Sequence, residues 1–283
     1  MKEIKVRKWE WKKRLVYVIV SLVWIILILG IIFNQLVYGV IFHVGYSNVY
    51  YGNNDRGNWI MNYAISKKKN PDGQIYHALS VQNTKNGNYN VAIEALEKAY
   101  KIKPKEAGAY YGWVSLYYYR DYEKALSILN EYDDSTPNFS DAPMGECVHY
   151  LKGLAYMQLE NYELAINEFN ISIKNTSRQN GEDWVSYLVF LNKGRCLLKL
   201  KKYNEAILYF KKSLSNYDKC AEAYYFIGIS ELGLQESQKA CENFNIALEL
   251  IKKGYKSSDL YVELFHEIYE QQVAKSILNN CAN

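Results

Sequence analysis

Apolar positions recur with helical spacing from about residue 72 to residue 253, without the apolar–polar alternation of a half-buried strand. Five alanines mark corresponding points of this pattern, and they are Ala92, Ala125, Ala165, Ala206 and Ala240. They lie 33, 40, 41 and 34 residues apart. A period in this range predicts a solenoid of helix pairs, in which each pair stacks on its neighbours.

A glycine and a tyrosine recur at fixed distances from these alanines. Gly153 precedes Tyr162 by nine residues, and Gly194 stands in the same relation to Tyr203. A glycine in the middle of a helix costs about 1 kcal/mol relative to alanine, so its recurrence indicates a packing role. We expect the glycine and the alanine to let two antiparallel helices approach closely and the tyrosine to cap the turn between them. An aromatic residue such as Phe169 is then expected to fill the groove toward the next pair. The positions predicted to build the repeats are Gly87, Tyr89, Ala92, Tyr122, Ala125, Gly153, Tyr162, Ala165, Gly194, Tyr203, Ala206, Gly228 and Ala240.

This combination resembles the tetratricopeptide repeat, a 34-residue helix–turn–helix unit. The first unit matches it at Gly87, Tyr89, Ala92, Leu96, Ala99 and Pro104. The second unit is degenerate, because Gly112 is one place out of register. The resemblance implies an all-α fold, a right-handed superhelix of five repeats with a concave face lined by the first helix of each pair. The predicted repeats are residues 72–105, 106–138, 146–179, 187–220 and 221–253.

The chain after the last repeat is predicted to be helical over residues 258–278. Leu260, Leu264, Ile268 and Val273 form a single stripe at helical spacing there. A solenoid needs a terminal element that covers its last apolar surface. We therefore expect residues 257–283 to be a capping helix and tail, in preference to a helix that binds a partner.

The N-terminal part carries the long apolar run of this chain, residues 15–33, which holds no charged residue. At a rise of 1.5 Å per residue its length approaches the roughly 30 Å of a bilayer's hydrocarbon core. Residues 1–14 hold seven basic and two acidic side chains, which predicts a cytoplasmic tail there. A transmembrane or interfacial segment is expected at 15–42, followed at 43–71 by a linker with a short helix at 59–69. The repeat domain would then be extracytoplasmic, and periplasmic in a bacterium.

A cleaved signal peptide is the alternative interpretation of the same run. Its apolar core is normally about 7–15 residues long and ends in a small-residue cleavage site. The run here is longer, and residues 29–36 contain no A-x-A pattern. A retained anchor is therefore favoured.

The net charge of +4 belongs to the N-terminal tail. Without residues 1–14 the chain holds 27 basic and 28 acidic side chains, so the repeat region is nearly neutral. A nucleic-acid-binding domain carries a basic stripe on its folded part. This balance therefore argues against nucleic acid as a partner.

Candidate chemistry is sparse. The five cysteines show no C-x-x-C pairing, and the four histidines do not stand at metal-ligand spacing. The cysteines are expected to be buried free thiols, with one disulfide possible outside the cytoplasm. We expect no metal, no cofactor and no enzymatic activity.

The concave face is the predicted binding site. By the register of the family, its side chains are Tyr150, Leu154, Leu191, Arg195, Tyr225 and Ile229, with His77 and Val81 in the first repeat. These do not reproduce the lysine and asparagine clamp of the family's chaperone adaptors. An aromatic and apolar concavity suits an amphipathic helix or an extended apolar peptide. The alternative is that any one of these side chains packs between neighbouring helices.

Two functions follow from this pattern. The first is a membrane-anchored scaffold that binds a protein or peptide partner non-covalently in its groove and organises a complex at the membrane. The second is a secreted or periplasmic protein that sequesters or regulates one target, in an inhibitor or immunity-type role.

Overall fold

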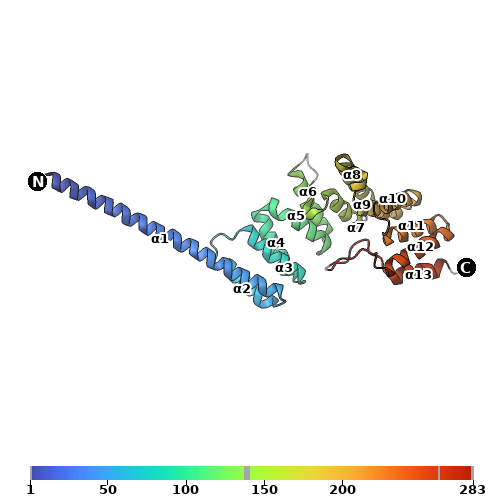
Figure 1. Ribbon diagram of the computed structural model, residues 1–283, viewed down its shortest axis with the longest axis horizontal. Coiled ribbons are helices and arrows are strands. Elements are labelled where there is room, and N and C mark those ends of the chain that lie inside the picture. The colour runs from blue at the N-terminus through green and yellow to red at the C-terminus, as the bar shows by residue number, and fades with distance from the viewer. Residues whose placement is uncertain (1, 137–140, 261, 282–283) are drawn as a thin grey trace. The chain divides into compact units, whose positions relative to one another are not determined.

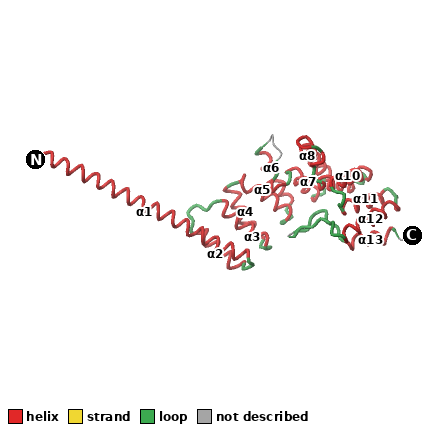
Figure 2. The backbone as a smooth tube through the Cα atoms, in the orientation of Figure 1, coloured by secondary structure: helices red, strands yellow, loops and turns green. Residues whose placement is uncertain are grey.

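The computed structural model describes residues 2–136, 141–260 and 262–281, and Figure 1 shows the course of the chain. Pro137, which falls in the second predicted repeat, lies outside the described residues. Within these ranges the regular structure is helical, as Figure 2 shows, and the all-α prediction is confirmed. The chain divides into two compact units, residues 1–103 and residues 104–283, which we call unit 1 and unit 2.

Unit 1 contains four helices. They are α1 (Lys2–Tyr50), α2 (Asn54–Ser66), α3 (Gly73–Lys85) and α4 (Tyr89–Ile102). The pair α3/α4 is the first predicted repeat, and Ala92 and Leu96 are fully buried in it. Gly87 ends the first helix of this pair with a φ of 76°, a left-handed conformation that glycine adopts without strain.

Most of the predicted linker at 43–71 is helical, and the short helix predicted at 59–69 falls largely within α2. Helix α1 continues to Tyr50, and α2 begins after a short turn. The two helices cross where Gly45 faces Gly57, and a Cβ atom added at Gly45 would lie 2.8 Å from the carbonyl oxygen of Gly57. Phe42, Val49 and Met61 are buried around this crossing. The glycines that suggest a linker by composition instead allow close packing, so α1 and α2 form a helix pair before the first repeat.

Side-chain amides tie this additional pair to α3. Asn58 and Asn83 exchange amide hydrogen bonds of 2.8 Å in both directions. Gln82 donates to the hydroxyl of Tyr46 at 2.6 Å, and Asn86 donates to the backbone carbonyl of Val49 at 2.8 Å. For the buried Gln82 and Asn83, these partners satisfy amides that would otherwise be unpaired at a cost in stability.

The described residues of unit 2 form four helix pairs and one further helix. They are α5 (Pro104–Tyr117) and α6 (Tyr122–Asp134), α7 (Val148–Gln158) and α8 (Tyr162–Asn180), α9 (Tyr187–Lys199) and α10 (Tyr203–Asn216), α11 (Ala221–Gly233) and α12 (Ser237–Lys252), and finally α13 (Glu270–Asn280). The alanines that set the sequence period all lie on second helices, and each is fully buried. The two longer junctions contain short 3₁₀ turns, at Pro143–Gly145 and Glu182–Trp184.

The recurring glycine supports an aromatic ring of its own pair. A Cβ atom at Gly153 would lie 2.5 Å from the ring of Phe169, and one at Gly194 would lie 2.6 Å from the ring of Phe210. The predicted close approach of the two helices is therefore present. The ring of Phe169 rests on the glycine of its own pair. The ring of Phe210 also stacks on Phe226 of the next pair, with centroids 5.8 Å apart, so the predicted packing toward the next pair is present there.

The out-of-register glycine of the second unit has a local cause. The turns between paired helices hold one left-handed residue two places before the second helix, as at Arg120, Glu160 and Lys201. Gly112 stands eight residues before Arg120, whereas Gly153 stands seven before Glu160. One additional residue therefore lies in the turn after α5. Gly112 still packs in the expected way, because a Cβ atom there would lie 2.7 Å from Leu129.

The turn tyrosines contribute to packing between pairs. A Cβ atom at Gly233, on the first helix of the following pair, would lie 2.5 Å from the ring of Tyr203. The ring therefore contacts the next repeat and does more than cap its own turn. Tyr89 is more open, with 40% of its surface exposed.

Replacing Gly194 with alanine tests the ring-on-glycine contact. We expect Gly194→Ala to lower the free energy of unfolding by about 1–3 kcal/mol, because the added methyl group overpacks against Phe210. This loss would outweigh the roughly 1 kcal/mol by which alanine favours a helix. Urea denaturation measures the change. Adding Phe210→Leu should recover part of the loss, and a strictly additive double variant would contradict direct contact.

Candidate partner-binding site

The first helices of unit 2 form a continuous inner face. Helix α5 contacts α7, α7 contacts α9, and α9 contacts α11, while the second helix of each pair packs against the first helix of the next pair. This arrangement provides the face that the repeat pattern predicts. Its side chains are partly covered by another segment of the same chain.

The covering segment is residues 253–269, here called the strap, of which residue 261 lies outside the described residues. Helix α12 ends at Lys252 and α13 begins at Glu270, so the helix predicted from residue 258 starts twelve residues late. In Figure 2 the strap is a loop that leaves α12, extends toward α5 and returns to α13. Leu260, predicted to belong to a buried stripe, is 93% exposed, whereas Ile268 and Val273 are fully buried. The capping role is kept by α13, which packs against α12.

The outer end of the strap is held at the turn between α5 and α6. Arg120 donates a hydrogen bond to the backbone carbonyl of Glu263. Its guanidinium group lies 4.4 Å from the ring centroid of Phe265, within the range of a cation–π contact. The Phe265 ring stacks on Tyr117 at 5.6 Å and meets Tyr122 edge-on at 6.1 Å. An aromatic anchor between two tyrosines and an arginine is therefore the main contact at this end.

The inner end of the strap is fixed to α11 by a charged hydrogen bond. The backbone N–H of Ser257 donates to Oε1 of Glu222 at 2.7 Å, and Glu222 is almost fully buried. The outgoing and returning parts of the strap are joined by Lys256, whose Nζ lies 3.5 Å from Oε2 of Glu267 and 4.8 Å from the ring centroid of Tyr269. The strap is consequently bound to the repeats and also braced internally.

His266 is buried in the middle of the strap. Only 4% of its surface is exposed, and its Nε2 has no hydrogen-bond partner among the described residues. Burial first, and then the positive charge of Arg195, lower the pKa of His266 to about 3. The docked strap therefore requires a neutral imidazole, since a buried charge without a partner is strongly unfavourable.

A cavity of about 380 Å³ remains beside the strap. Arg195 and Phe226 line it from the inner face, Glu160 from a turn, and Phe265 and Glu267 from the strap. Its mixed aromatic and charged lining is consistent with peptide contact.

The residues predicted to bind a partner fall into three groups. Leu154 and Leu191 are no more than 1% exposed and belong to the core between helices. Tyr150 and Tyr225 are buried too, and Arg195 is half-buried beside the cavity. The remaining three are also half-buried: Ile229 on α11, and His77 and Val81 on α3 in unit 1. Unit 2 therefore brings together six of the eight, and their part in binding stays a prediction.

The buried tyrosines are held by polar partners. Tyr150 accepts a hydrogen bond from Asn192 at 3.2 Å, and Tyr225 accepts one from Gln272 of α13 at 3.1 Å. Burial raises the pKa of the Tyr150 hydroxyl far above its usual value. Tyr225 is thus covered by the same C-terminal region that supplies the strap.

Sequence reasoning missed the residues that hold the strap. Arg120 stands in a turn and Phe265 lies beside the predicted apolar stripe. Neither is therefore at a position that the repeat pattern assigns to the concave face. The available signal was the polar cluster Ser257, Ser258 and Asp259 after Gly254, which favours a turn or loop over a helix.

A disulfide bond joins Cys241 of α12 to Cys281 after α13. The expectation of free thiols is therefore wrong for these two cysteines, whereas Cys196 and Cys220 are buried free thiols as predicted. Burial raises the pKa of each of those two thiols to about 12, which keeps them in the unreactive protonated form. Closing a loop of this length stabilises the fold by about 4 kcal/mol in the chain-entropy model. The bond fastens the end of α13, and with it the returning part of the strap.

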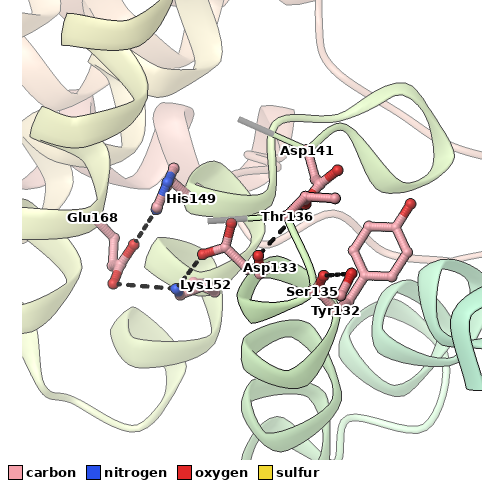
Figure 3. Close-up of polar contacts among 8 residues, drawn as sticks. All are labelled: Tyr132, Asp133, Ser135, Thr136, Asp141, His149, Lys152 and Glu168. Atoms are coloured by element: carbon pink, nitrogen blue, oxygen red, sulfur yellow. Dashed lines mark hydrogen bonds and ion pairs between the residues drawn. The ribbon is translucent and has the colours of Figure 1, made fainter. Parts of the chain in front are cut away.

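A cluster of charged side chains lies between α6, α7 and α8, as Figure 3 shows. Nζ of Lys152 lies 3.1 Å from Oδ2 of Asp133 and 3.8 Å from Oε1 of Glu168. The other oxygen of Glu168 lies 2.8 Å from Nδ1 of His149. The described residues contain no group of His, Cys, Asp and Glu side chains arranged to hold a metal ion. The contacts of Lys152 and His149 join α6, α7 and α8.

The sequence profile of the tetratricopeptide repeat matches residues 73–106, 148–174 and 188–220. These segments correspond to the pairs α3/α4, α7/α8 and α9/α10, so the resemblance found in the sequence is confirmed. The pairs α5/α6 and α11/α12 share the packing, with Gly112 against Leu129 and Gly228 against Phe244. A search of the curated proteins finds no match.

Solved structures with the same fold include two kinds of protein. MamA residues 41 to the end from Desulfovibrio magneticus RS-1 is 15% identical, with a TM-score of 0.54 over 66% of this chain and 98% of that chain. PilF from Pseudomonas aeruginosa is 18% identical, with a TM-score of 0.52 over 79% of this chain and 94% of that chain. At these identities the likeness shows the helical-repeat fold alone.

The burial of His266 predicts that acid weakens unit 2. Its folded pKa of about 3 lies below the unfolded value of about 6.5, so the unfolded state binds more protons between these values. The free energy of unfolding should fall by about 1.4 kcal/mol per pH unit as the pH drops below about 6. Urea denaturation at several pH values measures this slope, and His266→Leu should flatten it. Identical slopes for the two proteins would contradict the buried position of His266.

We expect the loss of a lysine from the buried cluster to destabilise the protein more than the loss of a lysine from a surface ion pair. Lys152→Met should lower the free energy of unfolding by about 3 kcal/mol, because it leaves two largely buried carboxylates without their cation. The exposed pair of Lys239 and Glu236 is the matched control, and Lys239→Met should change stability little. Equal effects in thermal or urea unfolding would argue against burial of the cluster.

Proposed function

We propose that this chain, which carries tetratricopeptide repeats, is a membrane-anchored scaffold that binds a protein partner non-covalently on the inner face of unit 2 and organises a complex at the membrane. The observation that carries this proposal is the strap, because it is a non-helical peptide segment already seated on that face. Repeat proteins use such faces to hold other molecules. The role is non-enzymatic, as is general for scaffolds of this family.

The strap also indicates what kind of partner segment the face accepts. Residues 262–268 are not helical, and they are held through a backbone carbonyl and one aromatic side chain. A partner segment of the same kind would be non-helical, with an aromatic residue for the position of Phe265 and an apolar residue for that of Ile268. We propose that such a segment takes the place of the strap, which makes a non-helical peptide a better candidate than an amphipathic helix.

The anchor is proposed from the continuity of α1. The stretch Val16–Tyr50 is long and apolar enough to cross a membrane, with a mean hydropathy of 3.0 in its most apolar part. From Phe42 onward the same helix packs in unit 1. Cleavage between residues 42 and 45 would remove Ile41 and Phe42 from that core, which favours a retained helix over cleavage at those positions. The inside location of the N-terminus rests on the basic tail.

An extracytoplasmic location of unit 2 is consistent with its disulfide. Disulfides persist in oxidising compartments and are rare in the cytosol. The bond between Cys241 and Cys281 therefore supports the proposed side of the membrane.

The alternative is a secreted or periplasmic protein that sequesters one target. Intact-mass measurement of the mature protein separates the two proposals. A mass that includes residues 1–45 supports the anchor, and loss of roughly the first 35–45 residues would end it.

Competition between strap and peptide tests the binding proposal. A labelled peptide with the sequence of residues 257–269 should bind Phe265→Ala at least roughly tenfold more tightly than wild type, because the variant strap has lost its anchor. Fluorescence anisotropy on the full-length protein in detergent measures the affinity. The same peptide carrying alanine for its phenylalanine is the control and should not distinguish the two proteins.

The outcome for a second variant locates the site. Adding Arg120→Ala to Phe265→Ala should weaken peptide binding again, since Arg120 contacts both the carbonyl and the ring of the seated segment. Arg178→Ala, an exposed arginine on α8, serves as the matched control. Equal binding of the peptide to wild type and to every variant would refute the inner face as the binding site.

A further inference from the structure

We propose that the C-terminal end of α2 and the loop behind it form a second membrane contact, in which Tyr63, Lys67, Lys68 and Lys69 lie against anionic lipid headgroups. This inference rests on the proposed anchoring by α1 and adds a surface to it. The contact would fix the height of unit 1 above the bilayer.

The level of this surface follows from the packing of α2 on α1. The two helices are antiparallel, since Gly57 faces Gly45 whereas Tyr63, farther along α2, meets Tyr38 with ring centroids 6.4 Å apart. Tyr38 stands five residues after the end of the apolar run at residue 33, about 7 Å farther along the helix axis. The headgroup layer of a bilayer is roughly 5–7 Å thick on each side. Tyr63 is therefore level with the outer part of that layer.

The three lysines follow directly after the end of α2 that lies nearer the bilayer. Helix α2 ends at Ser66, and the chain direction at that point is toward the membrane end of α1. Lys67 keeps its ammonium group 5.4 Å from the ring centroid of Tyr63. None of the three lysines forms an ion pair with a carboxylate of the described residues, so their charges are available to lipid phosphates. Each lysine near an anionic surface contributes measurably to membrane attachment.

The aromatic and apolar side chains around this surface suit the same location. The rings of Tyr63 and Trp59 are stacked at 5.8 Å, and 68% of the surface of Trp59 is exposed. Leu36 and Val40 of α1 remain open as well, 63% and 65% exposed. Tyrosine and tryptophan are enriched at membrane interfaces because one part of the ring system is apolar and another can donate a hydrogen bond. A solvated helix face would account for the lysines but not for this exposed aromatic and apolar surface next to a membrane span.

Quenching by brominated lipids tests the contact. The full-length protein is reconstituted into phosphatidylcholine vesicles with and without phosphatidylglycerol, with bromine placed near the headgroup end of the acyl chains. A tryptophan is introduced by Tyr63→Trp in a Trp59→Phe background. Tyr51→Trp in the same background is the matched control, because Tyr51 is exposed in the turn at the far end of α2. The tryptophan at position 63 should lose emission and shift to the blue, and that at position 51 should do neither.

Two further arms make each failure interpretable. The emission of Trp24, obtained as the difference between the protein and its Trp24→Phe variant, reports on the membrane span. Quenching of Trp24 without quenching at position 63 would overturn this inference but would leave the anchor supported. An unquenched Trp24 would overturn the anchor. Replacing all three lysines with glutamine should reduce quenching at position 63 in phosphatidylglycerol vesicles only. Unchanged quenching there would overturn the role of the lysines.

Discussion

The helix pairs of unit 2 depend on one contact, a large apolar side chain of the second helix laid on the bare backbone of a first-helix glycine. The rings of Phe169, Phe210 and Phe244 occupy this position in three pairs, and Leu129 occupies it in the fourth. A methyl group on any of these glycines would need space that the phenylalanine ring or the leucine side chain already fills. The glycine weakens its helix, but it sets the distance between the paired helices.

This spacing also creates the inner face and its covering strap. Because each first helix contacts the first helix of the next pair, together they form the continuous inner face. The strap covers that face through an aromatic anchor at Arg120, a buried neutral histidine and the disulfide-fastened helix α13. Because the strap covers this face, a partner can bind there only by displacing the strap, and its apparent affinity is lowered by the free energy of docking the strap. The repeat fold thus supplies the site, and the C-terminal region sets how accessible it is.

The sequence predicted the repeats well because their signal is local. Periodicity and the fixed spacing of glycine, tyrosine and alanine were enough to place the helix pairs, including the pair whose turn is one residue longer. The misses involve long-range contacts. Residues 258–269 have helical periodicity, but Phe265 and Ile268 pack against helices that are distant in the sequence. The free energy gained by this packing outweighs the local preference for a helix. The extent of helix within the predicted linker was missed for a related reason, since Gly45 and Gly57 serve close packing that composition does not reveal.

In the resting protein, the strap lies on the inner face of unit 2. Hydrogen–deuterium exchange of the full-length protein at neutral pH tests this placement most directly. The amides of Ser257, Leu264 and Glu267 each donate a hydrogen bond in the docked strap, so they should exchange slowly, at rates comparable to those of helical amides. Exchange of these amides at the rate of an unstructured loop would contradict the docked strap and the account built on it.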